Sequence, residues 1–105
     1  MLDNIMTATA IPFKEGRFAD PPAETYAITF DDVTADGPDG INAIFTHDVS
    51  VELYELRPDA AAESALEAEL NARGIPWTKQ ARYWLASIKR YQVLYEFSYI
   101  EKRRI

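Results

Sequence analysis

The clearest pattern in this chain is an alternation of apolar and polar residues near its C-terminal end. Residues 91–100, YQVLYEFSYI, put aromatic and β-branched side chains on one face with a period of two. The segment contains neither Gly nor Pro, either of which would weaken a hydrogen-bond ladder. The pattern predicts the best strand of the protein, with one face in the core and the other, which carries Leu94 and Ile100, left to be covered.

Weaker alternations predict the other strands. Residues 25–31 alternate cleanly, and so does the later half of residues 41–56, so the two segments predict a long antiparallel hairpin. The residues between them, 31–40, are rich in Asp, Gly and Pro, which predicts a mobile loop. Residues 77–85 predict a further strand, which pairs with residues 91–100 as a second hairpin.

The main helix is predicted over residues 60–73. Asp59 is suited to cap its N-terminus, and the segment is rich in strong helix formers. At the other end, Gly74 is suited to a left-handed conformation. Ile75 would then lie over Leu70, the hydrophobic contact of a Schellman ending.

Two less distinct elements precede these. Residues 2–10 have the apolar spacing of a short helix, and residues 11–18 predict a short extended segment that bends at Gly16. The resulting order, β-β-β-α-β-β, predicts one α+β domain over residues 1–105. We expect a mixed, mainly antiparallel sheet of four to five strands, one main helix on one face, and one crossover connection.

Composition narrows the class of protein. A chain of 105 residues with 48% hydrophobic and 27% charged residues is expected to fold as one domain with a thin core. The net charge of -6 disfavours sequence-specific nucleic-acid binding and binding to anionic membranes. Basic residues cluster only at 102–104, where a solvated tail is the expectation. There is no Cys, no signal-like N-terminus and no long apolar run, which predicts a protein of the cytoplasm without disulfides.

No residue pattern predicts a reaction. His47 is the only histidine, and without a second His or any Cys it is expected to be a structural or surface residue. No carboxylate stands in a context that predicts a raised pKa, and phosphate-binding loops and nucleophile motifs are absent. We therefore expect no enzyme, no cofactor and no metal.

The acidic segment invites a calcium interpretation that then fails. Asp31, Asp32, Asp36 and Asp39 lie close together, and the run begins with spacing similar to that of an EF-hand loop. The twelfth position, which should be a bidentate Glu, is Ala43. The expectation is a solvated acidic hairpin loop.

The aromatic content suggests uncovered surface. One helix about 10 Å wide shelters about two strands spaced about 4.8 Å apart, fewer than the sheet is expected to contain. The remaining surface needs a partner or stays exposed, and its aromatic residues lead us to expect self-association, with Trp84, Leu94 and Ile100 as candidate contacts. The alternative is a small ligand-binding or regulatory domain whose aromatic residues line a pocket.

Several weak motifs occur in a characteristic order: GRF at 16–18 followed by prolines, HDVSVELYEL at 47–56, ARGIPW at 72–77, WLAS at 84–87 and YQVLYEFSY at 91–99. In this order and spacing the chain resembles the small minor tail proteins of tailed phages and prophages, of the tail-completion type. It departs from them at the N-terminus, where similar proteins carry a longer leading helix.

The resemblance implies a structural role without catalytic residues. Such a protein would act as a tail terminator or head–tail joining protein, forming a ring, often a hexamer, and contacting other tail or connector proteins. It would occupy the cytoplasm of a bacterial host during assembly and then the virion. If the acidic residues from Asp31 to Asp39 line the lumen of such a ring, their charge would repel passing DNA.

Overall fold

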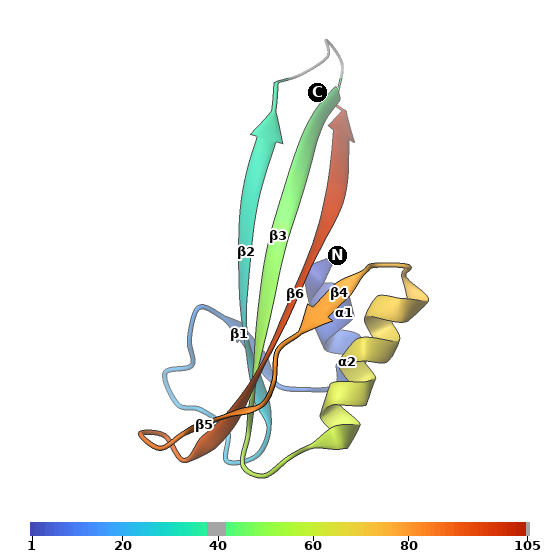
Figure 1. Cartoon of the computed structure of the whole chain (residues 1–105). Coiled ribbons are helices and arrows are strands. Elements are labelled where there is room, and N and C mark those ends of the chain that lie inside the picture. Colours follow the sequence, from blue (N-terminus) through green and yellow to red (C-terminus); the bar gives the residue numbers. More distant parts are fainter. Residues whose placement is uncertain (38–41, 105) are drawn as a thin grey trace.

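A computed structural model describes residues 1–37 and 42–104 (Figure 1). It contains two helices and a six-stranded sheet, which confirms the predicted α+β class. In chain order the elements are α1 (Leu2–Thr9), β1 (Phe13–Glu15), β2 (Tyr26–Asp36), β3 (Asn42–Glu55), α2 (Ala60–Ala72), β4 (Trp77–Lys79), β5 (Tyr83–Leu85) and β6 (Arg90–Arg104).

The sheet is mixed and mainly antiparallel, as predicted. Its strand order is β1-β2-β3-β6-β4, and β5 pairs with β6 beside β4. Among the paired strands of the described residues, only the β1–β2 pair is parallel. Because β3 and β4 both pair with β6 in the antiparallel sense, α2 makes a crossover connection between two strands that run in the same direction.

The prediction of one strand over residues 77–85 is wrong in part. Lys79 pairs with Tyr95 but Tyr83 pairs with Gln92, so one extra residue lies between the two pairings. This shift divides the segment into β4 and β5, as a bulge does. The sheet therefore has six strands where four to five were expected.

The prediction of a loop over residues 31–40 is also wrong in part. β2 continues through this acidic segment to Asp36, which pairs with Ile44 of β3. The segment's low strand propensity is overridden because each residue finds a partner on β3. Asp39, the last of the acidic residues, lies outside the described part of the chain.

Both ends of α2 agree with the local signals in the sequence. The side chain of Asp59 accepts a hydrogen bond from the N–H of Ala62 at 3.0 Å. Gly74 has a φ of 66°, and the N–H of Ile75 donates to the C=O of Leu70 at 3.0 Å. These bonds satisfy backbone groups that a helix end leaves free, and they confirm the predicted Schellman ending.

The core lies between the two helices and one face of the sheet (Figure 1). Ile5 of α1 and Leu66 of α2 are fully buried, and so are Val51 of β3 and Tyr95 of β6, which pair with each other. The short helix α1 therefore shares the covering role that the sequence assigned to α2 alone. Among the described residues, neither helix has the length and apolar character needed to cross a membrane.

Three strands extend beyond the helices and make the molecule long, with principal extents of 50 × 28 × 22 Å (Figure 1). We call this extension the arm. It consists of residues 32–36 of β2, 42–48 of β3 and 98–104 of β6, which pair in register. The rest of the described chain is the body.

Candidate functional site

The helix-side face of the arm is organised by His47. Its side chain is 7% exposed, its Nδ1 lies 2.8 Å from an oxygen of Asp31, and its Nε2 lies 2.8 Å from an oxygen of Glu101. The ring stacks on Tyr99, with centroids 4.4 Å apart and planes 8° apart. One imidazole thus ties all three strands together where the arm leaves the body.

The two carboxylates determine the charge of His47. Burial alone would lower its pKa, but the hydrogen bonds and charges of Asp31 and Glu101 outweigh burial and raise the pKa above the usual 6.5. Glu101 also binds Arg103, and Arg103 and His47 together lower the pKa of Glu101 to about 2. The imidazolium form can donate from both ring nitrogens at once. The geometry makes His47 a structural clamp.

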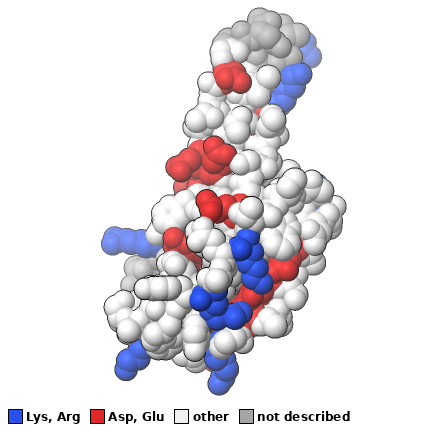
Figure 2. All heavy atoms as spheres, in the orientation of Figure 1, with Lys and Arg blue, Asp and Glu red and all other residues white. Residues whose placement is uncertain are grey.

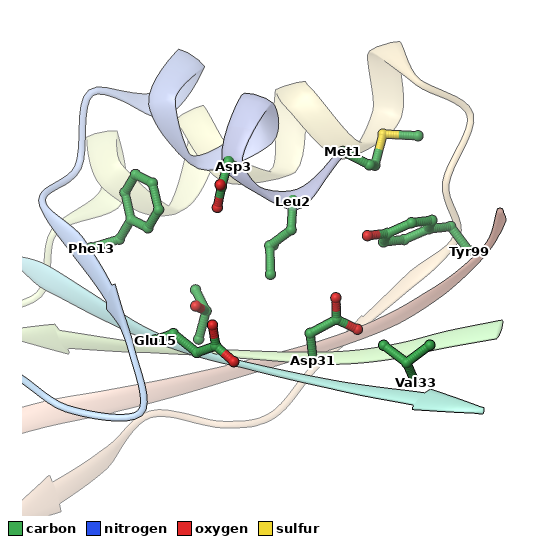
Figure 3. Close-up of a pocket in the computed structure, with 9 residues that line it drawn as sticks. Met1, Leu2, Asp3, Phe13, Glu15, Asp31, Val33 and Tyr99 are labelled. Atoms are coloured by element: carbon green, nitrogen blue, oxygen red, sulfur yellow. The ribbon is translucent and has the colours of Figure 1, made fainter. Parts of the chain in front are cut away.

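An open hollow of about 380 Å³ lies beside this clamp, between the start of α1 and the strands (Figure 3). Leu2 points from α1 toward the sheet, Asp31 and Val33 rise from β2, and Tyr99 lies beside Met1. Two of its nine lining residues are aromatic, against three carboxylates. It therefore lacks the aromatic lining that the ligand-binding alternative expects.

The opposite face of the arm carries apolar and charged side chains in the open. Ile100 is 71% exposed, and Phe30, on the same face of β2 two residues before the arm, is also exposed. Asp32 lies directly opposite Asp48 in the β2–β3 register, and the hydroxyl of Ser98 donates to Asp48 at 2.6 Å. Like charges directly opposite each other destabilise a sheet, so this face is not optimised for the stability of one chain.

The three candidate contact residues do not form one patch. Leu94 is half-buried and lies on the same sheet face as Ile100, six residues and about 20 Å along β6. Trp84 is 47% exposed, but it pairs with Tyr91 on the helix-side face. Any contact that uses all three residues must therefore involve more than one surface of the chain.

The acidic residues are divided between the two faces in the same way. Asp31 faces the helix side and is bound to His47, whereas Asp32 and Asp36 project from the opposite face of β2. Asp31, Asp32 and Asp36 all lie in β2, so the prediction that placed them in a loop is wrong. Figure 2 shows acidic side chains along the side of the arm where β2 runs.

A second polar cluster, missed from the sequence, lies in the body. Nη2 of Arg82 lies 2.6 Å from Glu63, and Nζ of Lys79 lies 2.8 Å from the same carboxylate. Glu55 is fully buried and binds Nε of Arg82 at 3.3 Å. These bonds attach the β4–β5 segment to α2.

The two buried carboxylates of this cluster have opposite pKa shifts. Burial, with the neighbouring Glu63, raises the pKa of Glu55, which corrects the expectation that no carboxylate has a raised pKa. Burial opposes ionisation of Glu63 as well, but hydrogen bonds from Glu55, Lys79 and Arg82 lower its pKa. Pairs of carboxyl groups whose pKa values are shifted in opposite directions are typical of acid–base catalytic sites. The side chain of Glu55, however, is fully buried, so no substrate can reach it. Glu55 instead connects β3 to Arg82 inside the fold.

Among the described residues, no group of three or more His, Cys, Asp or Glu side chains is arranged to hold a metal ion. In comparisons with known proteins, no family model and no curated protein matches the chain. Solved structures do match. One is a chain in the virion of a native gene transfer agent particle, with a TM-score of 0.57 and 16% identity over 90% of this chain and 81% of that one.

The two chains share a fold. At this identity the likeness concerns the arrangement of helices and strands, and it extends over nearly the whole of this protein.

Proposed function

We propose that this protein is a structural component of a phage or prophage particle. In this proposal it completes the tail, or joins tail to head, by assembling into a ring. Two lines support the proposal. The weak sequence motifs resemble tail-completion proteins, and the fold is shared with a chain from the virion of a gene transfer agent.

The arm is the observation that carries the proposal. The body has a core buried under two helices, whereas the arm leaves Ile100 exposed on a face that no described element covers. Exposed apolar surface rimmed by charge is typical of sites where proteins meet. A single chain gains little from a projecting ribbon of this kind, so the arm is best explained as a surface for assembly.

The position of the helices suggests which face would line the ring. Both helices cover the same face of the sheet (Figure 1), so the opposite face is the one free to turn inward. That face carries Asp32 and Asp36. We infer that these two carboxylates, with Asp48 of β3 on the same face, would repel passing DNA along the β2 side, whereas Lys102 and Arg104 of β6 would offset part of this charge. Asp31 is excluded from this role because it binds His47.

The remaining candidate contacts would serve different neighbours. Ile100, on the arm, would contact an adjacent subunit. Leu94 and Trp84, in the body, would contact another tail or connector protein. In this proposal the protein assembles in the cytoplasm of a bacterial host and then remains in the virion, with no sequence-specific contact to DNA.

The proposal is tested by the mass of the native protein. We expect light scattering after size exclusion, over a range of concentrations, to show a closed oligomer, with six times the chain mass of 11.9 kDa as the leading expectation. Negative-stain images should show rings. A monomer at every concentration, and also in the presence of purified tails, would contradict the proposal.

A further inference from the structure

The arm has two open edges. On one side, β1 pairs with β2 only as far as Thr29, and residues 32–36 have no strand beside them in the described chain. On the other side, β4 pairs with β6 only as far as Phe97, and residues 98–104 are likewise unpaired on that side. Open edges present backbone donors and acceptors that can bind another strand.

The hydrogen bonds of the body show which groups point outward from β2. The N–H of Ala27 and the C=O of Thr29 bond toward the β1 side, at 2.8 and 3.1 Å. Backbone groups of a strand alternate between its two edges with a period of two. The N–H and C=O groups of Asp31, Val33 and Ala35 therefore point to the open edge.

The same reasoning applies to β6. The C=O of Leu94 accepts a hydrogen bond from the N–H of Gln80, on the β4 side, at 2.9 Å. Farther along the strand, the backbone groups of Ser98, Ile100 and Lys102 therefore point to the open edge. Each arm edge thus offers a row of free donors and acceptors.

The two edges carry opposite charge on the helix-free face. Asp32 and Asp36 project from β2, whereas Lys102 and Arg104 project from β6. Asp36 and Lys102 lie at the same level of the arm, because both are in register with Ile44 of β3. Figure 2 shows the acidic side chains on one side of the arm and basic side chains near its end on the other.

We propose that the β2 edge of one arm pairs with the β6 edge of the arm of the next copy. With neighbouring arms pointing in the same direction, the pairing would be parallel, because β2 and β6 both run antiparallel to β3. Since the two edges differ, the contact is heterologous, and repeated contacts of this kind form a ring where the rotation from one copy to the next closes. Two β2 edges would instead bring Asp against Asp. The proposal rests on the ring assembly proposed above and names the surface that makes it.

Disulfide cross-linking tests the pairing directly, because the chain has no Cys of its own. Asp36→Cys and Lys102→Cys would be introduced together. Within one chain these positions are separated by β3 and lie about 10 Å apart, too far for a disulfide. We expect mild oxidation to give a ladder of linked chains on a non-reducing gel, and each single variant to give none.

Neighbouring arms could pair with a shift of two residues in either direction along the strands. Two further double variants test these registers, with Ile100→Cys or Arg104→Cys in place of Lys102→Cys. A ladder with any of the three pairs supports the proposal. If none gives a ladder while the wild-type protein forms oligomers by light scattering, the edge pairing is wrong and the ring proposal stands. If the wild-type protein is a monomer throughout, both are wrong.

A pair of proline variants supplies a matched control. Val33→Pro removes an N–H that points to the open edge, whereas Thr34→Pro removes one that points toward β3. We expect the Val33→Pro chain to unfold like the wild type in urea but to lose assembly. The Thr34→Pro chain should instead be destabilised. Wild-type assembly by the Val33→Pro protein, with Val33→Ala as the side-chain control, would overturn the proposal.

Discussion

Strands β2, β3 and β6 run through both the body and the arm, but different interactions stabilise the two regions. In the body, Val51 and Leu53 of β3 are fully buried against the helices. In the arm, the positions with the same orientation are His47, which is held by carboxylates, and the half-buried Phe45. The body is thus stabilised by burial and the arm by pairs of side chains across strands. This difference assigns stability to the body, and it agrees with the proposal that the arm makes the contacts between copies.

Magnitudes support this division. Burying an aliphatic or aromatic side chain contributes about 1.5–3 kcal/mol, whereas a cross-strand pair contributes about 0.2–1 kcal/mol. In the described chain, the core contains fifteen buried residues from the helices, the sheet and two connecting segments. The body can therefore fold whether or not the arm has a partner, and substitutions in the two regions should differ accordingly.

The largest difference is expected between two aliphatic truncations. Leu66→Ala removes a fully buried side chain and should lower the free energy of unfolding by about 2–5 kcal/mol. Ile100→Ala, on the exposed face of the arm, should change it by less than about 0.5 kcal/mol. Urea unfolding of the dilute protein measures both. Equal losses would show that arm and body form one stability unit.

Removing the clamp should have an intermediate effect. His47→Ala leaves Asp31 without its imidazole partner, and we expect a loss of about 1–3 kcal/mol in the free energy of unfolding. Amide exchange should rise in the arm and not under α2. His47→Gln, which keeps one donor, serves as the conservative control and should lose less. A rise in exchange over the whole sheet would contradict the local role of His47.

The contribution of His47 to the stability of the arm should also depend on pH. Because the folded pKa of His47 is raised above the unfolded value of 6.5, its stabilising contribution is complete below pH 6.5 and is lost as the pH rises through the folded pKa. As the only histidine, it can be titrated by NMR without ambiguity. A pKa at or below 6.5 would show that the two carboxylates do not hold the imidazolium.

The smallest change in the free energy of unfolding is expected in the arm at Asp32, which lies opposite Asp48. Asp32→Asn removes the repulsion from Asp48 and should stabilise the dilute protein by about 0.2–1 kcal/mol. Asp36→Asn is the control, because its partner on β3 is Ile44 and no change is expected. Urea unfolding again measures both. A destabilised Asp32→Asn protein would mean that Asp32 has a structural role within the monomer.

Local signals in the sequence predicted much of the body, although they did not predict the division of residues 77–85 into β4 and β5. The alternation of residues 91–100 predicts β6, and Asp59 and Gly74 predict the limits of α2. Each of these depends on neighbours in the chain or on a simple period, so no tertiary information was needed.

The arm was harder to predict because its stability comes from distant residues. The carboxylates that hold His47 are 16 and 54 positions away in sequence, and no local pattern indicates them. The run of Asp residues predicts a loop by propensity, and only pairing with β3 makes it a strand. Likewise, the raised pKa of Glu55 depends on Glu63 and on burial under the finished fold.

Amide hydrogen exchange, compared between the dilute and the concentrated protein, tests the division into body and arm most directly. We predict that the outward amides of Val33, Ala35, Ile100 and Lys102 exchange freely in the dilute protein and become protected on assembly. Amides of residues 49–55 in the body should be equally protected in both states. Unchanged exchange in the arm of an assembled protein, or protection gained only in the body, would contradict the account.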